Sequence, residues 1–255
     1  MQILLTNDDG IYAPGLEALE WELRRLGDVC VVSPAVEQSG VGHSITFLSP
    51  LVCQEIFAGE RRRGWAVEGS PADCVKIGLF EFCPQRPKLV VSGINSGLNA
   101  GINVLYSGTV AAAIEGAFFE ITSVAVSLEY DPHADYARAA KIAGRLIEQL
   151  LEQQGPRPQL YNVNIPLAAL KLPAPEVRVV PMAVARYGES FEKRIDPRGR
   201  SYYWATNDPP APATPEETDL SALLKGYVTV TPLDYDLTKR GHLNAMRSWQ
   251  LTAPD

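Results

Sequence analysis

The sequence predicts an α/β protein with a Rossmann-like, doubly wound, mostly parallel sheet and a β-rich C-terminal arm. Short apolar runs alternate with helical patterns through about residue 165, which is typical of parallel sheets. Beyond about residue 178, aromatic extended runs separated by prolines replace this alternation. We therefore expect one domain over 1–255, with a core at about 1–180 and an oligomerisation arm at about 181–255.

The elements expected up to residue 82 follow from apolar periodicity and helix-start signals. Pro14 suits the first turn of a helix, and Ser70 with Asp73 forms an N-cap followed by an acidic first turn. We interpret the basic cluster Arg61-Arg62-Arg63 as a solvated hairpin turn. In order, we expect a strand at 3–5, a helix at 14–26, a strand at 29–33, a hairpin with arms at 44–56 and 64–68, and a helix at 71–82.

The remaining elements continue the alternation and then break it. We expect a strand at 88–92, a Gly/Asn loop to 108, a helix at 109–119, a strand at 123–128, a helix at 136–153 and a strand at 161–165. Extended runs are expected at 202–204 and 227–231. The prolines within 208–215 exclude a continuous helix there and predict a loop.

Composition narrows the class of protein. A content of 46% hydrophobic residues in 255 supports a large core, and a net charge of -7 argues against a surface that wraps nucleic acid. The start lacks a basic segment, and no apolar run approaches the length of a membrane span. The four cysteines lack metal-ligand spacing, so we expect buried free thiols and a cytoplasmic location.

The run Asn7-Asp8-Asp9-Gly10 follows directly on the first predicted strand. Open α/β sheets bind ligands at the carboxyl ends of their strands, so Asp8 and Asp9 fall in a predicted active-site crevice. Two adjacent carboxylates repel unless a cation neutralises them, and oxygen ligands favour Mg²⁺ or Mn²⁺. The alternative is a turn alone, because Asn and Gly are also common turn residues.

The Gly/Asn loop at 93–103 and the helix start behind it form the second signal. Gly-rich backbone approaches anions closely, and exposed amides at a helix start bind phosphate, with hydroxyls from Ser107 and Thr109 as further donors. The alternative is that one of these hydroxyls only caps the helix. Neither Gly-Lys-Ser/Thr nor Gly-x-Gly-x-x-Gly is present, which disfavours Walker-type hydrolysis and a dinucleotide cofactor.

A third loop, at 33–44, leaves the same predicted sheet edge. The Ser39 hydroxyl and the Asn95 amide oxygen could therefore join Asp8 and Asp9 around one ion, leaving places for water and a substrate phosphate. His43 in this loop could donate a proton, although a lone loop histidine is more often structural.

Several ordered motifs together resemble the survival protein E (SurE) family of 5′-nucleotidases. They are Leu5-Thr6-Asn7-Asp8-Asp9-Gly10, Ser39-Gly40, Gly69-Ser70-Pro71-Ala72-Asp73, the loop 95–101, Tyr106-Ser107-Gly108-Thr109, Asp196-Pro197-Arg198-Gly199-Arg200 and Asp236-Leu237-Thr238. The resemblance implies a Rossmann-like core, dimers or tetramers built through exchanged arms, and a cytoplasmic location. It also implies one divalent cation per subunit held by Asp8, Asp9, Ser39 and Asn95, and a phosphate cradle of Asn95, Ser96, Gly97, Asn99, Ser107, Gly108 and Thr109.

These features predict a metal-dependent phosphomonoesterase that converts nucleoside monophosphates to nucleoside and phosphate. A haloacid-dehalogenase phosphatase would need Asp-x-Asp-x-Thr after its first strand, which is absent. A non-catalytic metal- and nucleotide-sensing module stays open as the alternative. Tyr106, Tyr187 and Phe191 could stack on a base, or equally pack within the core or arm.

Overall fold

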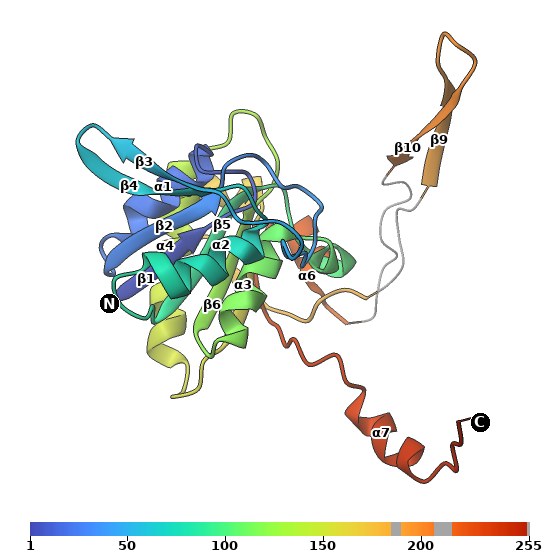
Figure 1. The fold of residues 1–255 in the computed structure, drawn as a ribbon. Coiled ribbons are helices and arrows are strands. Elements are labelled where there is room, and N and C mark those ends of the chain that lie inside the picture. Colours follow the sequence, from blue (N-terminus) through green and yellow to red (C-terminus); the bar gives the residue numbers. More distant parts are fainter. Residues whose placement is uncertain (185–189, 207–215, 254–255) are drawn as a thin grey trace.

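The computed structural model describes residues 1–184, 190–206 and 216–253. Its centre is a nine-stranded sheet (Figure 1). In spatial order the strands are β3 (Cys53–Ala58), β4 (Arg61–Val67), β2 (Asp28–Pro34), β1 (Gln2–Thr6), β5 (Leu89–Ser96), β6 (Thr122–Leu128), β7 (Leu160–Ile165), β11 (Val228–Pro232) and β8 (Val177–Val179). The run from β4 to β7 is parallel, which confirms the predicted class of fold.

Two pairs of helices cover the two faces of the sheet (Figure 1). Helices α1 (Pro14–Leu23) and α4 (Tyr136–Gln153) pack on one face, and α2 (Pro71–Ile77) and α3 (Gly108–Phe118) pack on the other. Shorter helical segments complete the described chain: a π-helical turn at Gly78–Phe82, a 3-10 turn at Gly101–Leu105, α5 (Leu167–Leu170), α6 (Asp219–Leu224) and α7 (Arg240–Arg247). Among the described residues, no helix has the length and apolar character needed to cross a membrane.

Strand β1 shows why the sheet has helices on both faces. Ile3 and Leu5 belong to the hydrophobic cluster beneath α1 and α4, whereas Leu4 belongs to the cluster beneath α2 and α3. Successive strand side chains point to opposite faces, so a run that is apolar at every position requires burial on both sides. The burial of β1 between two neighbours places its carboxyl end in the middle of the sheet edge.

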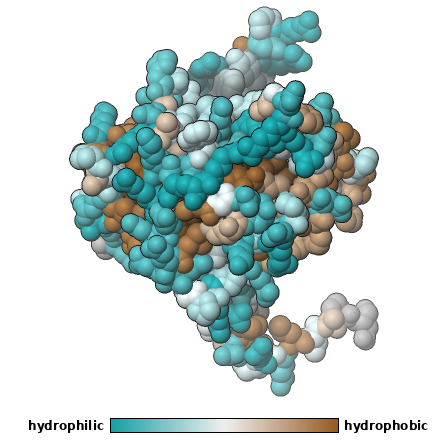
Figure 2. Space-filling model, turned by 90° about the vertical axis from the view of Figure 1, so that its left-hand side faces the viewer, coloured by the Kyte–Doolittle hydropathy of each residue, from teal (hydrophilic) through white to brown (hydrophobic). Residues whose placement is uncertain are grey.

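The β3–β4 hairpin differs from the sequence expectation. The arginine cluster is not the turn: Arg61 to Arg63 begin β4, and Gly59, with φ of +64°, lies in the turn. Arg62 forms a cross-strand ion pair with Glu55 at 2.7 Å and lies 5.0 Å from the ring centre of Trp65 on its own strand, so both contacts favour the extended form. Figure 2 looks onto this side of the molecule, where hydrophilic residues are interspersed with hydrophobic ones.

The C-terminal part divides between sheet and arm. β9 (Ser190–Ile195) and β10 (Ser201–Thr206) form a separate hairpin that extends away from the sheet, as does α7 (Figure 1). In contrast, β11 lies within the main sheet, antiparallel to β7. The boundary expected near residue 180 therefore does not separate sheet from arm, because this late strand completes the core. The predicted proline-rich loop at 208–215 lies outside the described residues.

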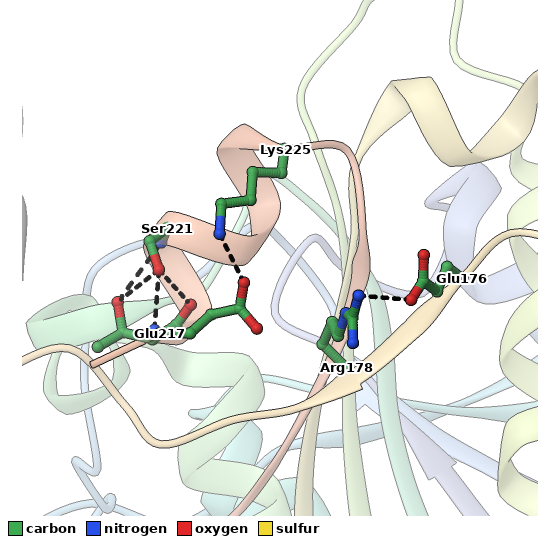
Figure 3. Close-up of polar contacts among 6 residues, drawn as sticks. Glu176, Arg178, Glu217, Ser221 and Lys225 are labelled. Carbon is green, nitrogen blue, oxygen red and sulfur yellow. Dashed lines mark hydrogen bonds and ion pairs between the residues drawn. The ribbon is translucent and has the colours of Figure 1, made fainter. Parts of the chain in front are cut away.

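Exposed ion pairs occupy the edge of the sheet at β8. Figure 3 shows Arg178 of β8 paired with Glu176, and Lys225, which follows α6, paired with Glu217, at 2.6 and 2.7 Å. Exposed pairs of this kind contribute about 0–1 kcal/mol each. Charged side chains on an edge strand also discourage pairing with another chain, which agrees with the short length of β8.

Gly15 provides a test of how α1 is placed against β5. A Cβ atom at this position would lie 2.1 Å from the Ile94 carbonyl oxygen, a backbone atom. We expect Gly15→Ala to lower the free energy of unfolding by about 2 kcal/mol or more, because the backbone must move. Urea unfolding measures this change, with Gly155→Ala as the control because a Cβ atom on Gly155 would have no neighbour within 4 Å. Equal stability of the two variants would contradict the packing described.

Candidate active site

The turn after β1 is built by Asn7 and Gly10. The Asn7 side chain accepts a hydrogen bond from the Gly10 amide at 3.2 Å and donates one to the Gly10 carbonyl at 3.0 Å. The Ser33 hydroxyl of β2 donates to the same Asn7 oxygen. Gly10 has φ of +99°, which favours glycine. These hydrogen bonds form a turn, and the turn is what presents the two carboxylates that lie inside it.

Asp8 is buried and fixed by the start of α3. Its Oδ1 accepts a hydrogen bond from the Thr109 hydroxyl at 2.5 Å. A Cβ on Gly108 would lie 3.1 Å from Asp8 Oδ2, so a larger residue there would crowd the carboxylate. Burial raises the pKa of Asp8 above its usual value, the Thr109 hydrogen bond opposes this, and Glu37 adds a smaller upward effect. Asp8 is thus held as a partly desolvated carboxylate beside a helix N-terminus.

Asp9 is less buried and is held from the opposite direction. Its Oδ2 accepts a hydrogen bond from the Ser96 amide at the end of β5, at 3.1 Å. Burial, and next the neighbouring charge of Asp8, raise the pKa of Asp9 to about 6. The hydrogen bond from the Ser96 amide lowers the pKa of Asp9 and so opposes these two effects. Burial of both carboxylates and the charge of Asp8 next to Asp9 therefore disfavour the ionised forms, the situation that a bound cation relieves.

The loop after β2, which carries Ser39, returns to the turn after β1. The Gln38 amide donates to the Asp8 carbonyl at 2.8 Å, which fixes the loop against the turn. Ser39 itself is exposed, and its hydroxyl donates to Glu37 Oε1 at 2.5 Å. Glu37 therefore links Ser39 to the two aspartates, whose pKa values its charge raises. The sequence interpretation gave Glu37 no role, although it lies in the same loop.

Asn95 and Gly97 lie at the end of β5, which extends past the predicted limit of 92. The Asn95 side-chain amide donates to the Gly97 carbonyl at 2.6 Å, and the Gly97 amide donates to the Leu128 carbonyl at 2.8 Å. Asn95 and Ser96 are partly buried beside Asp9. The structure thus brings Asp8, Asp9 and the 95–97 segment together at one edge.

Asn99 faces a different environment. Its side-chain amide donates to the Ser127 hydroxyl at 2.9 Å, and its backbone carbonyl accepts from Asn162 at 2.7 Å and Asn164 at 3.1 Å. Its backbone amide donates to Asn164 Oδ1 at 2.8 Å. All of these groups are buried. The structure therefore uses Asn99 to anchor the loop to β6 and β7, and its side chain is not among the groups facing Asp9.

The start of α3 carries the remaining predicted residues. Ser107 caps the helix by accepting a hydrogen bond from the Val110 amide at 3.1 Å. Gly108 and Thr109 contact Asp8 as described above. An eleven-residue helix thus directs its N-terminal end at the aspartates, and the positive end of its dipole favours anions there. At this helix start, Ser107 caps the helix while Thr109 bonds to Asp8.

Two anchors of the Gly/Asn loop were not predicted. Asp219 of α6 is fully buried and accepts hydrogen bonds from the Gly101 amide at 2.7 Å and the Ala183 amide at 2.8 Å. Asn162 and Asn164 lie in β7, where polar residues alternate with apolar ones although both faces are buried. Buried polar side chains in such a strand are the signal that could have identified this network.

The donor chemistry fits a hard divalent cation. In the described part of the chain, no group of three or more His, Cys, Asp or Glu side chains could hold a metal ion. Two carboxylates with raised pKa values, supplemented by hydroxyl and amide oxygens, form an incomplete set of oxygen ligands of the kind Mg²⁺ accepts when water and phosphate complete its shell.

Comparison with known proteins agrees with the motifs. The sequence model of a family described as survival protein SurE matches residues 3–192. A protein described as 5′-nucleotidase SurE from Rhodopirellula baltica is 56% identical over 252 residues, covering 98% of this chain and 99% of that protein. A protein of the same description from Carboxydothermus hydrogenoformans is 42% identical over 257 residues, covering 98% and 96%. The crystal structure of the SurE protein from Aquifex aeolicus gives a TM-score of 0.83 at 37% identity, covering 97% and 98%.

The four cysteines are free, as expected, but only Cys74 is fully buried. Cys30, Cys53 and Cys83 are half-buried, because they lie near the β3–β4 edge or at the end of the π-helical turn. Tyr106 and Phe191 are more than half exposed, whereas Tyr187 lies outside the described residues.

The raised pKa of Asp9 predicts a pH-dependent effect in metal-free protein. Between pH 4 and 6 the unfolded chain has lost this proton while the folded protein retains it, so stability falls as the pH rises. We expect Asp9→Asn to raise the free energy of unfolding by about 1–2 kcal/mol above pH 6, with no gain below pH 4. Denaturant unfolding in chelator measures this, with Asp28→Asn as an exposed control. A pH-independent difference between Asp9→Asn and wild type would contradict the mutual repulsion.

The Thr109 hydroxyl allows a second test. In Thr109→Val the buried Asp8 oxygen loses its donor, and we expect a loss of about 1–3 kcal/mol in the free energy of unfolding. Thr109→Ser keeps a hydroxyl and should retain most of the stability. If both substitutions cost the same, packing of the threonine methyl group would be responsible instead of the hydrogen bond.

Proposed function

Because the chain belongs to the survival protein SurE family, we propose that it is a 5′-nucleotidase, a metal-dependent phosphomonoesterase that hydrolyses nucleoside monophosphates to nucleoside and phosphate. We extend the proposal to 3′-nucleotides as additional substrates. One observation supports it above the others: Asp8 and Asp9 share one sheet edge with the N-terminal end of α3. A cation site and an anion site thus lie side by side, as phosphoryl transfer requires.

In this proposal Asp8 and Asp9 are the principal ligands of one Mg²⁺ or Mn²⁺, and Ser39 and Asn95 contribute further oxygen atoms. When bound, such an ion supplies charge neutralisation for the phosphoryl oxygens and lowers the pKa of a coordinated water. The hydrogen bonds from Thr109 and Ser96 orient the two carboxylates before substrate arrives. This reduces the rearrangement needed on binding.

The phosphate group would lie between the aspartates and the start of α3. Gly108 lets the helix start approach Asp8 closely, because a Cβ there would lie 3.1 Å from Asp8 Oδ2, and the amides of the first helical turn carry partial positive charge. Ser96 and Gly97 would bound the other side of this space. We propose direct attack by a water molecule that Asp8 or Asp9 orients, with the phosphoryl group transferred in line and the nucleoside hydroxyl leaving.

We also propose that the C-terminal arm joins two or more copies of the chain in the cytoplasm. The β9–β10 hairpin projects from the core (Figure 1). It carries large exposed side chains. Tyr203 and Trp204 are each 59% exposed, and Phe191 is 71% exposed. Exposed aromatic residues on a projecting hairpin are typical of a surface that another subunit covers.

The activity is tested by phosphate release from a panel of 5′- and 3′-nucleoside monophosphates. We expect release to stop with chelator and to return with Mg²⁺ or Mn²⁺. Asp9→Ala is expected to lower kcat/KM at least about 100-fold, because the cation loses a principal ligand. Asp28→Ala, at the opposite end of strand β2, is the matched control and should retain activity.

The outcome separates hydrolysis from sensing. Stoichiometric nucleotide binding without phosphate release, with either metal, would contradict the phosphatase proposal and favour the sensing module. Full metal-dependent turnover by Asp9→Ala would instead contradict the ligand assignment.

The subunit contact is tested with Trp204→Ser. If the hairpin is buried between subunits, removing this indole should weaken self-association about tenfold or more, because aromatic residues dominate such interfaces. Sedimentation equilibrium measures the dissociation constant, with the exposed Trp21→Ser on α1 as the control. A wild-type chain that sediments as a monomer would contradict the proposal.

A further inference from the structure

A mostly apolar cavity of about 280 Å³ lies along α3. This volume is close to the lower end of the range of about 300–1,000 Å³ usual for small-molecule sites. Its described wall includes Ile114 and Phe118 of α3, Leu233 and Tyr235 of the segment after β11, and His43 and Ser107 from two loops. The cavity is thus built by segments from the beginning, middle and end of the chain.

The cavity reaches the helix start that forms part of the proposed phosphate site. Ser107, in its wall, is the residue that caps α3, and Gly108 and Thr109, which follow it, contact Asp8. The loop that carries Ser39 and His43 is fixed to the same place, since the Gly42 amide donates to the Tyr106 carbonyl at 3.0 Å. A ligand with its phosphate at the helix start could therefore extend directly into this space.

Aromatic rings line the cavity away from the helix start. Phe118 stacks on His43 with ring centres 5.3 Å apart, and Tyr235 meets Phe118 edge-on at 4.6 Å. Phe118 is 47% exposed and Tyr235 is 44% exposed, so ring surface is available to a ligand. Aromatic side chains bind bases of differing sequence by stacking, because every base has a π face.

A buried acid fixes the one imidazole in this wall. Glu115 is 6% exposed, and its Oε2 lies 2.7 Å from His43 Nε2. This pairing and the stacking on Phe118 leave the His43 ring little freedom to rotate. A fixed polar group in an apolar cavity is the arrangement that orients a ligand which is partly aromatic and partly polar.

We propose that this cavity binds the nucleoside part of the substrate, with the base against Phe118 and Tyr235 and with His43 as a positioning residue held by Glu115. The inference rests on the proposed phosphatase function and adds where the nucleoside lies. It explains why a hydrolase built on a phosphate site would prefer nucleotides: the base adds stacking contacts that a plain phosphate ester lacks.

A second cavity flanks the same loop on its other side and serves as a comparison. This cavity has a volume of about 500 Å³. Its described lining includes Val36, Ile45, Thr46 and Ser70 and no aromatic side chain. Stacking therefore favours the cavity along α3 for the base. Ile45, 47% exposed, is a suitable position for a matched control.

The test compares a purine nucleoside monophosphate with ribose 5-phosphate, which keeps the sugar phosphate and lacks the base. We expect Tyr235→Ala to lower kcat/KM for the nucleotide about tenfold and to change that for ribose 5-phosphate less than about twofold. Tyr235→Phe keeps the ring and should retain the preference, and Ile45→Ala should change neither substrate. His43→Ala is expected to raise KM for the nucleotide more than it lowers kcat.

Binding of adenosine, measured by calorimetry, gives a readout that needs no turnover. Wild type should bind it, and Tyr235→Ala should bind about tenfold more weakly. If no phosphate is released from any substrate while this difference persists, the phosphatase function fails and the nucleoside site stands. Equal losses on both substrates, or a selective nucleotide loss in Ile45→Ala, would overturn the cavity assignment.

Discussion

The proximity of two adjacent carboxylates, one buried and one partly buried, governs the architecture of this sheet edge. Asp8 and Asp9 follow a strand that is covered on both faces, and burial raises the pKa of each. The fold offsets this cost with one hydrogen bond from α3 and one from the end of β5, which approach from different elements. The two hydrogen bonds leave net negative charge at this edge, which is the charge that the proposed divalent cation would neutralise.

This constraint also explains why so many distant segments meet at one edge. Thr109 must start a helix at the aspartates, Ser96 must extend β5 past the end of β1, and Gln38 must return from β2. The parallel order of β2, β1 and β5 brings all three loops to the same end of the sheet. A site assembled from three loops on rigid strands combines precise positions with room for a substrate.

The sequence predicted what depends on local pattern. Apolar runs identified the parallel strands, and Asn7 with Gly10 identified a turn that presents two acids. It failed where the deciding contact is distant: Asn99 has the same local surroundings as Asn95, yet Asn162 and Asn164 hold it in a buried network. The arginine cluster was wrongly assigned to a turn because its partner across the hairpin, Glu55, becomes visible only with strand pairing. Strand β11 was recognised as extended, but its pairing with β7 required the fold.

The anchoring of the Gly/Asn loop by Asp219 has a consequence for biosynthesis. A ribosome makes the chain from its amino end, so Asp8, Asp9 and the loop emerge long before Asp219 and β11. Until those late residues are released, the Gly101 amide lacks its carboxylate and β7 lacks a neighbour on one side. This edge of the sheet can therefore reach its final form only near the end of translation.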